Sequence, residues 1–98
     1  MTDIRFEWDD SKSVLNKRKH GISFEEASTV FSDDYALLIN DPDHSLEEDR
    51  FILLGLSSSI NILIVCHCYR SKDEIIRIIS ARKANHNEKN QYIFRWEK

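Results

Sequence analysis

The spacing of hydrophobic residues predicts helices in the first third of the chain and mainly strands after it. A helix with one buried face is indicated by residues at positions i, i+3, i+4 and i+7, namely Phe24, Ala27, Ser28 and Phe31. Just before this stretch, Ser23 and Glu26 stand three apart, as in a capping box that starts a helix. Farther along, short apolar runs alternate with turn residues, which is typical of strands.

The expected elements, in chain order, are a short strand at 4–8, a helix from Asp9 or Asp10 to about His20, a helix from 23 to about 33, strands at 35–40, 51–56, 60–69 and 75–81, and a closing helix from 82 or 83 to about 96. Consecutive strands this close in sequence favour an antiparallel meander. The predicted fold class is therefore α+β. It has two N-terminal helices, a four-stranded antiparallel meander, a C-terminal helix and room for a short additional N-terminal strand. With 98 residues, we expect a single domain at 1–98.

Charged residues are unevenly distributed along the chain, although the net charge is only −3. Residues 1–49 hold 5 basic and 13 acidic side chains, a balance of −8, whereas residues 50–98 hold 9 basic and 4 acidic, a balance of +5. If the basic strands share one face, that face can bind phosphate in spite of the overall sign. The alternative is that these charges pair with one another across the surface.

Nothing in the sequence predicts a membrane segment or a signal peptide. It contains no run of about 18 apolar residues, and its start lacks a cationic segment followed by an apolar one. We therefore expect a cytoplasmic protein that does not contact a membrane.

The sequence also predicts no metal ion or other cofactor. Cys66 and Cys68 flank His67 in an expected strand, where alternation places both thiols on one face and His67 on the other. The segment 41–49 resembles a calcium loop only faintly, because it lacks the glycine at the sixth position of such loops. We interpret it as a solvated loop.

Cleavage of RNA without a metal ion needs a base, an acid and positive charge at the phosphate. On the first helix, Lys19 and His20 stand three and four residues after Asn16, so the three share a face at the helix C-terminus. The negative end of the helix dipole favours a cation there. The alternative is that Lys19 and His20 only cap the helix.

Further candidates lie on the last two strands, namely His67, Arg70, Arg77 and Arg82. A guanidinium group presents a planar fork of donors that matches two phosphate oxygens, which makes arginines on a half-buried strand notable. Antiparallel pairing would bring Arg70 close to the residues just after the turn, and Arg82 close to the start of the preceding strand. Alternation would also place Arg77 and Arg82 on opposite faces unless a bulge intervenes.

Aromatic side chains are a third kind of candidate, because exposed bases of RNA stack on them. The candidates are Trp8, Tyr69, Tyr92 and Trp96. Most aromatic residues in so short a chain are expected in the core.

Several of these motifs, in this order, resemble the BrnT-type toxin family. The segments are FEWD at 6–9, NKRKHGISFEEA at 16–27, EDRF at 48–51 with Gly55, HCYR at 67–70 and IRIISARKA at 76–84. The resemblance implies a RelE-like fold and a type II toxin that cleaves RNA and arrests translation. It also implies neutralisation by a cognate antitoxin, of the ribbon-helix-helix, BrnA-like kind, whose complex represses its own operon. DNA would be contacted only through the antitoxin.

The resemblance assigns catalytic roles to Lys19, His20, Arg70 and Arg82, and substrate contacts to His67 and Arg77. Trp8 and Tyr92 are added as stacking residues. We expect the cationic side chains to converge in one pocket around a phosphate. Two alternatives stay open: a non-catalytic module that acts as co-repressor with a ribbon-helix-helix protein, and a toxin that has lost its activity.

Overall fold

The structure is a computed structural model that describes residues 4–40, 50–72 and 74–96. Its elements are β1 (Arg5–Glu7), α1 (Asp10–His20), α2 (Phe24–Thr29), the 3₁₀ helix η1 (Val30–Ser32), β2 (Leu37–Asn40), β3 (Phe51–Leu56), β4 (Ile62–Arg70), β5 (Ile75–Lys83) and α3 (His86–Trp96). The predicted α+β class is confirmed. The segment interpreted as a solvated loop, 41–49, lies outside the described residues. Within them, every helix is too short or too polar to cross a membrane.

The strands form one five-stranded sheet in the order β1-β5-β4-β3-β2. β2, β3, β4 and β5 pair antiparallel with their neighbours in sequence, so the predicted meander is confirmed. The additional N-terminal strand pairs parallel with β5, with Arg5 opposite Ile75. The sheet is therefore mixed, because α1 and α2 carry the chain from β1 at one edge to β2 at the other.

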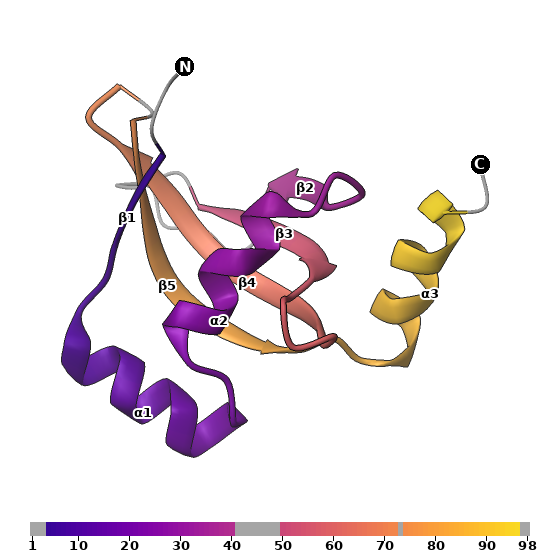
Figure 1. Ribbon diagram of the computed structural model, residues 1–98, viewed down its shortest axis with the longest axis horizontal. Coiled ribbons are helices and arrows are strands. Elements are labelled where there is room, and N and C mark those ends of the chain that lie inside the picture. Colours follow the sequence, from indigo (N-terminus) through magenta and orange to yellow (C-terminus); the bar gives the residue numbers. More distant parts are fainter. Residues whose placement is uncertain (1–3, 41–49, 73, 97–98) are drawn as a thin grey trace.

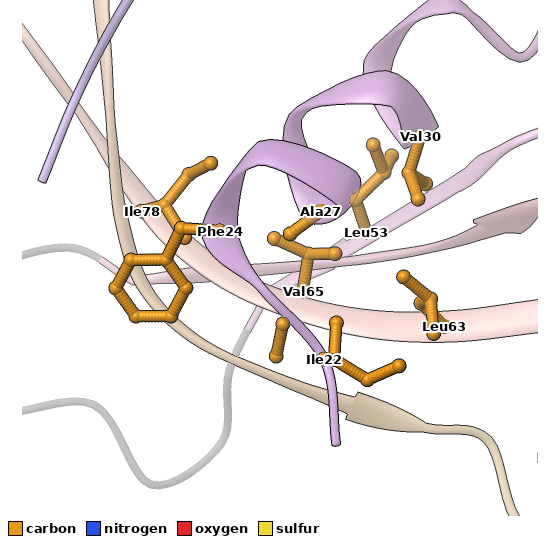
Figure 2. Packing of buried hydrophobic residues seen from close by; sticks show 9 residues of the cluster. Ile22, Phe24, Ala27, Val30, Leu53, Leu63, Val65 and Ile78 are labelled. Carbon is orange, nitrogen blue, oxygen red and sulfur yellow. The ribbon is translucent and has the colours of Figure 1, made fainter. Parts of the chain in front are cut away.

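The sheet separates two layers of helices (Figure 1), with α1 and α2 on one side and α3 on the other. Between α2 and the sheet lies the main core, which consists of Ile22, Phe24, Ala27, Val30, Leu53, Leu63, Val65, Ile78 and Ala81. Figure 2 shows these side chains filling the space between the helix and the strands. Burial of each large apolar side chain stabilises the fold by about 1.5–3 kcal/mol. We call this side of the sheet the α2 face and the opposite side the α3 face.

A smaller cluster on the α3 face joins α3 to the sheet. It consists of Leu54, Ile64, Ala84 and Tyr92, with partly buried apolar side chains around it. Figure 1 shows α3 on the side of β2 and β3, away from β1. Ser80 in the middle of β5 is exposed, so α3 leaves part of its own face of the sheet uncovered.

Both glycines occupy positions that a larger residue would disturb. Gly21 ends α1 with a φ of 75°, a left-handed conformation that glycine adopts at little cost. A Cβ atom at Gly55 would lie 2.8 Å from Val30 Cγ1. Glycine at this point of β3 therefore lets η1 pack directly against the strand.

The boundary between β5 and α3 differs from the prediction. The strand continues to Lys83 and α3 begins at His86, so Arg82 is a strand residue and not the first residue of a helix. A capping box sets the boundary: Asn85 Oδ1 accepts the N–H of Glu88 at 2.9 Å, and Glu88 Oε1 accepts the N–H of Asn85 at 2.8 Å.

Candidate functional site

A β-bulge in β5 decides which face its arginines occupy. Along β4 the pairing runs without interruption, but on β5 it passes from Ser80 to Ile78 and leaves Ile79 as an extra residue. Side chains alternate between the two faces of a regular strand, so Arg77 and Arg82, an odd number of residues apart, would lie on opposite faces. The extra residue shifts the alternation by one position and puts both arginines on the same face. The alternation along the sequence predicted opposite faces unless a bulge intervened, and the bulge is present.

Arg77 and Arg82 both lie on the α3 face. Arg82 pairs with Ile64, which belongs to the cluster beneath α3. Arg77 pairs with Cys68, four residues after Ile64 on β4 and therefore on the same face.

Two further arginines share this face, beside the β4–β5 turn. Arg5 of β1 and Arg70 of β4 both align with Ile75. Arg5 is two residues before Glu7, whose carboxylate reaches Arg77 on the α3 face, so alternation gives Arg5 the same side. We call the group of Arg5, Arg70, Arg77 and Arg82 the basic face.

Glu7 connects two arginines of the basic face. Its Oε2 atom accepts a hydrogen bond from Arg77 at 2.8 Å and lies 3.6 Å from Nε of Arg70. The hydrogen bond to Glu7 raises the pKa of Arg77 above its ordinary value. The Arg70 side chain is 53% exposed and meets Glu7 only at this longer distance, so more than half of its surface is open to a ligand.

Arg82 is held by Glu88 at the start of α3. The two groups form a bidentate pair, with N–O distances of 2.8 and 2.9 Å. The pairing raises the pKa of Arg82 and lowers the pKa of Glu88. The Arg82 side chain is nevertheless 42% exposed, so a competing anion can reach it.

The basic face is too long for its arginines to meet at one phosphate. Arg82 pairs with Ile64, and Arg70 is six residues farther along β4, which corresponds to roughly 20 Å along the strand. The expectation of a single pocket that includes both arginines is therefore wrong for this conformation. The register instead gives two groups, Arg70 with Arg77 at one end and Arg82 at the other.

Asn16 fastens α1 to the outer edge of β5. Its amide group donates to the carbonyl oxygens of Ile22 (2.9 Å) and Ala81 (2.8 Å), and its Oδ1 accepts the N–H of Ala81 (3.1 Å). β1 pairs only with the first part of β5, so the Asn16 side chain takes the place of a neighbouring strand beyond it. The sequence showed that Asn16 shares a face with Lys19 and His20, but gave no sign of this contact.

Lys19 and His20 lie near the Arg82 end of the sheet. They follow Asn16 within one helical turn, and Asn16 is bonded to the residue just before Arg82. Figure 1 shows α1 at the end of the molecule where β5 finishes, opposite the β4–β5 turn. Lys19 is exposed and His20 is partly exposed.

His67 lies on the α2 face and has no exposed surface. The ring centre of Phe31 is 4.8 Å from that of His67, and Tyr69 is 5.2 Å away. Its Nδ1 is 3.1 Å from the carbonyl oxygen of Val65, which only accepts, so Nδ1 donates and Nε2 accepts from the Tyr69 hydroxyl. Burial lowers the pKa of His67. A position without exposed surface differs from that expected of a residue that contacts a substrate.

The buried imidazole of His67 should make the fold less stable in mild acid. Below a pKa of 6.5 the unfolded chain takes up a proton here that the folded chain resists, so the free energy of unfolding decreases as the pH falls. One such group changes stability by at most about 1.4 kcal/mol per pH unit. We expect His67→Gln, which can still donate to Val65, to show a shallower decrease between about pH 7 and pH 5 in urea unfolding. An equally steep decrease in both proteins would contradict this assignment.

Trp8 and Tyr92, the aromatic residues expected to stack with a substrate, both pack against the protein. Trp8 is partly buried, and its ring meets Phe24 edge to face at 6.1 Å. Tyr92 is 2% exposed, and its hydroxyl donates to Asp33 at 2.6 Å. Burial alone would raise the pKa of Asp33, but the bonds from Tyr92 and from two backbone N–H groups outweigh it and lower the pKa. Asp33 thus joins η1, β3 and α3.

Two other features of the structure lack the side chains of a phosphate-binding or metal site. Among the described residues, no group of three or more His, Cys, Asp or Glu side chains is arranged to hold a metal ion. An open pocket of about 460 Å³ has no cationic side chain and no residue of the basic face in its lining, which consists of Thr29, Ser32, Asp33, Leu56, Ser57 and Ser58.

Comparison with known proteins relates the chain to a family of toxins. The family model described as "Ribonuclease toxin, BrnT, of type II toxin-antitoxin system" matches residues 8–88. Among solved structures, the 1.1 Å crystal structure of the Brucella abortus ribonuclease toxin BrnT matches with a TM-score of 0.63 and 23% sequence identity, over 86% of this chain and 100% of that chain. The comparison with curated proteins gives no match. At this identity the structural likeness shows a shared fold.

Proposed function

The chain belongs to the BrnT family of ribonuclease toxins of type II toxin–antitoxin systems, and from this premise we propose that it cleaves RNA without a metal ion. The proposal includes inhibition of translation in the cytoplasm and neutralisation by a cognate antitoxin. That antitoxin would be a ribbon-helix-helix, BrnA-like protein that supplies the only contact with DNA.

The observation that best supports RNA as the substrate is the basic face. Four arginines lie on one side of β1, β5 and β4, and among the described residues their ion pairs involve two carboxylates, those of Glu7 and Glu88, so these paired groups leave positive charge in excess. This local excess of positive charge contrasts with the net charge of −3 of the whole chain. A single RNA strand along the face would meet Arg82 at one phosphate and Arg70 with Arg77 at another.

We assign the reacting phosphate to the Arg82 end of the sheet, at the outer edge of β5, where Asn16 bonds α1 to Ala81. Lys19 and His20 lie on the α2 side of this edge and Arg82 lies on the α3 face, so the phosphate would have to lie at the edge itself, between the two sides. In the proposed reaction the 2′-oxygen attacks the adjacent phosphorus while a base removes the 2′-hydroxyl proton. The bond from phosphorus to the 5′-oxygen breaks, and an acid gives that oxygen a proton, which leaves a 2′,3′-cyclic phosphate and a 5′-hydroxyl. Lys19 and His20 would supply the base and the acid, and Arg82 would stabilise the charge on the phosphoryl oxygens.

The other predicted residues take supporting roles in this proposal. Arg70 and Arg77 would bind a neighbouring phosphate, and the exposed Arg70 is the better placed of the two. Trp8 keeps a partly exposed ring that a base can reach. His67 and Tyr92 are buried, so they would act through the packing of the sheet.

Cleavage in the absence of metal ions tests the proposal directly. We expect the purified chain to cut single-stranded RNA at the same rate in excess EDTA as in magnesium, because cationic side chains replace the metal. We also expect no cutting of an RNA that carries a 2′-deoxy nucleotide at the scissile position, because the attacking oxygen is missing. Loss of cleavage in EDTA that magnesium restores would contradict the metal-free mechanism.

Cleavage and growth assays with this chain test the two alternatives, a co-repressor module and an inactive toxin. A folded chain that cuts no RNA and does not arrest growth on expression would favour the co-repressor module or an inactive toxin. Arrest of growth together with cleavage yielding 2′,3′-cyclic ends would exclude both.

A further inference from the structure

α1 is oriented with its polar residues toward the protein and its aliphatic residues toward solvent. The side that meets the sheet carries Ser13, Asn16 and His20, at positions i, i+3 and i+7, and Asn16 is 8% exposed. On the outward side, Val14 is 54% exposed and Leu15 is 60% exposed. A surface helix normally has the opposite arrangement. The hydrogen bonds of Asn16 to β5 fix this orientation.

The exposed aliphatic pair is surrounded by positive charge. Four cations of α1 are exposed, namely Lys12, Lys17, Arg18 and Lys19. Lys17, Arg18 and Lys19 lie in the last turn, whereas Lys12 lies in the first turn beside the two acidic residues of this helix, the N-cap Asp9 and Asp10. In a protein with a net charge of −3, this face of α1 is basic as well as apolar.

We infer that the outward face of α1 binds an acidic amphipathic helix of a partner protein. Val14 and Leu15 share the outward face of α1 with Ser11 and Arg18, and they would contact apolar residues of the partner helix. Acidic residues of the partner, next to those apolar residues, would pair with the lysines of α1. A second copy of this chain docked symmetrically through α1 fits less well, because it would bring the two sets of four cations together. RNA fits less well too, because aliphatic side chains give bases no surface for stacking.

Under the proposed function, this partner is the antitoxin, and its position has a consequence. Lys19, one of the four cations, and His20 lie in the last turn of α1, one turn after Leu15. A helix bound along the outward face of α1 would therefore lie beside the exposed Lys19 and restrict the approach of RNA to this turn, although His20 itself faces the sheet. Binding and inhibition would follow from the same contact.

The test uses the full chain and the protein encoded by the reading frame next to its gene as the probe. We expect the two to copurify, and Val14→Gln with Leu15→Gln to weaken their complex by roughly tenfold to a hundredfold in a binding titration. Glutamine preserves the charge and the helix propensity of α1. Lys12→Gln with Lys17→Gln should also weaken the complex and reduce its dependence on salt.

A matched control is Ile60→Asn, which removes an aliphatic side chain that is 81% exposed on the β3–β4 turn. It should bind the probe as tightly as wild type. No complex with the probe, or equal binding by the Val14→Gln, Leu15→Gln protein, would overturn the inference. A chain that self-associates alone and becomes monomeric in that double variant would overturn it in favour of a second copy.

RNA cleavage by the unbound variants is measured separately. The Val14→Gln, Leu15→Gln protein should cut RNA at the wild-type rate and resist inhibition by the probe. Lower RNA affinity in this variant would mean that α1 binds nucleic acid instead, and would overturn the inference. Failure of the proposed ribonuclease function would appear as no cleavage by wild type, while the binding titration would still decide on the partner surface.

Discussion

Replacing Arg82 with alanine should lower kcat for RNA cleavage by about a hundredfold to a thousandfold. Arg82 follows Ala81, the residue of β5 to which Asn16 of α1 is bonded, and its guanidinium already forms a bidentate pair with the carboxylate of Glu88. That geometry is also the one that suits two phosphate oxygens. Loss of one such donor group at a developing negative charge costs about 2–4 kcal/mol of transition-state stabilisation. Single-turnover cleavage of a defined RNA measures the effect.

Three further variants distinguish this role from a structural one. Glu88→Gln removes the charge that competes for Arg82, so cleavage should be retained or increased. Arg82→Lys keeps the charge but not the fork of donors, and should recover only part of the rate. Arg70→Ala should raise KM more than it lowers kcat, because Arg70 lies at the far end of β4. A folded Arg82→Ala protein that cuts RNA at the wild-type rate would refute the assignment.

The order and type of the elements could be predicted from the sequence because each depends on local patterns. The helical spacing from Phe24 to Phe31 and the N-cap at Ser23 mark α2 and its extension into η1, and both elements are present. Ser23 accepts the N–H of Glu26 as in a capping box, whereas the Glu26 carboxylate accepts from Ser57 and Asn61. Turn residues between apolar runs mark the strands, and β3 has the predicted bounds, Phe51–Leu56. The end of β5 was predicted too early, although Asn85 and Glu88 stand three apart in the sequence, as a capping box requires.

The layout of the site depends on features that the sequence does not reveal. The bulge at Ile79 brings Arg77 and Arg82 to one face, yet the surrounding residues read as a regular strand. A bulge depends on how two strands register across the sheet, so local pattern alone does not locate it. Glu7 belongs to the predicted first strand, and its contact with Arg70 and Arg77 follows only from the parallel pairing of β1 with β5.

The second large effect concerns the stability of the fold. Asn16→Leu should lower the free energy of unfolding by about 3–5 kcal/mol, because it leaves the N–H of Ala81 and the carbonyl oxygens of Ala81 and Ile22 without their bonds. Domains of this size have a total stability of about 5–15 kcal/mol, so a large share would be lost. Urea unfolding followed by circular dichroism measures the change.

Two matched variants show whether the hydrogen bonds of Asn16 account for that loss. Asn16→Asp keeps an oxygen that can accept from Ala81 N–H but places a carboxylate beside two carbonyl oxygens, so it should also be strongly destabilised at neutral pH. Protonation of that carboxyl restores a donor, so lowering the pH should recover part of its stability relative to wild type. Lys17→Ala on the exposed side of α1 should change stability by less than about 0.5 kcal/mol. If Asn16→Leu were as mild as Lys17→Ala, α1 would not depend on β5 for its orientation, and the outward placement of Val14 and Leu15 would lose its physical cause.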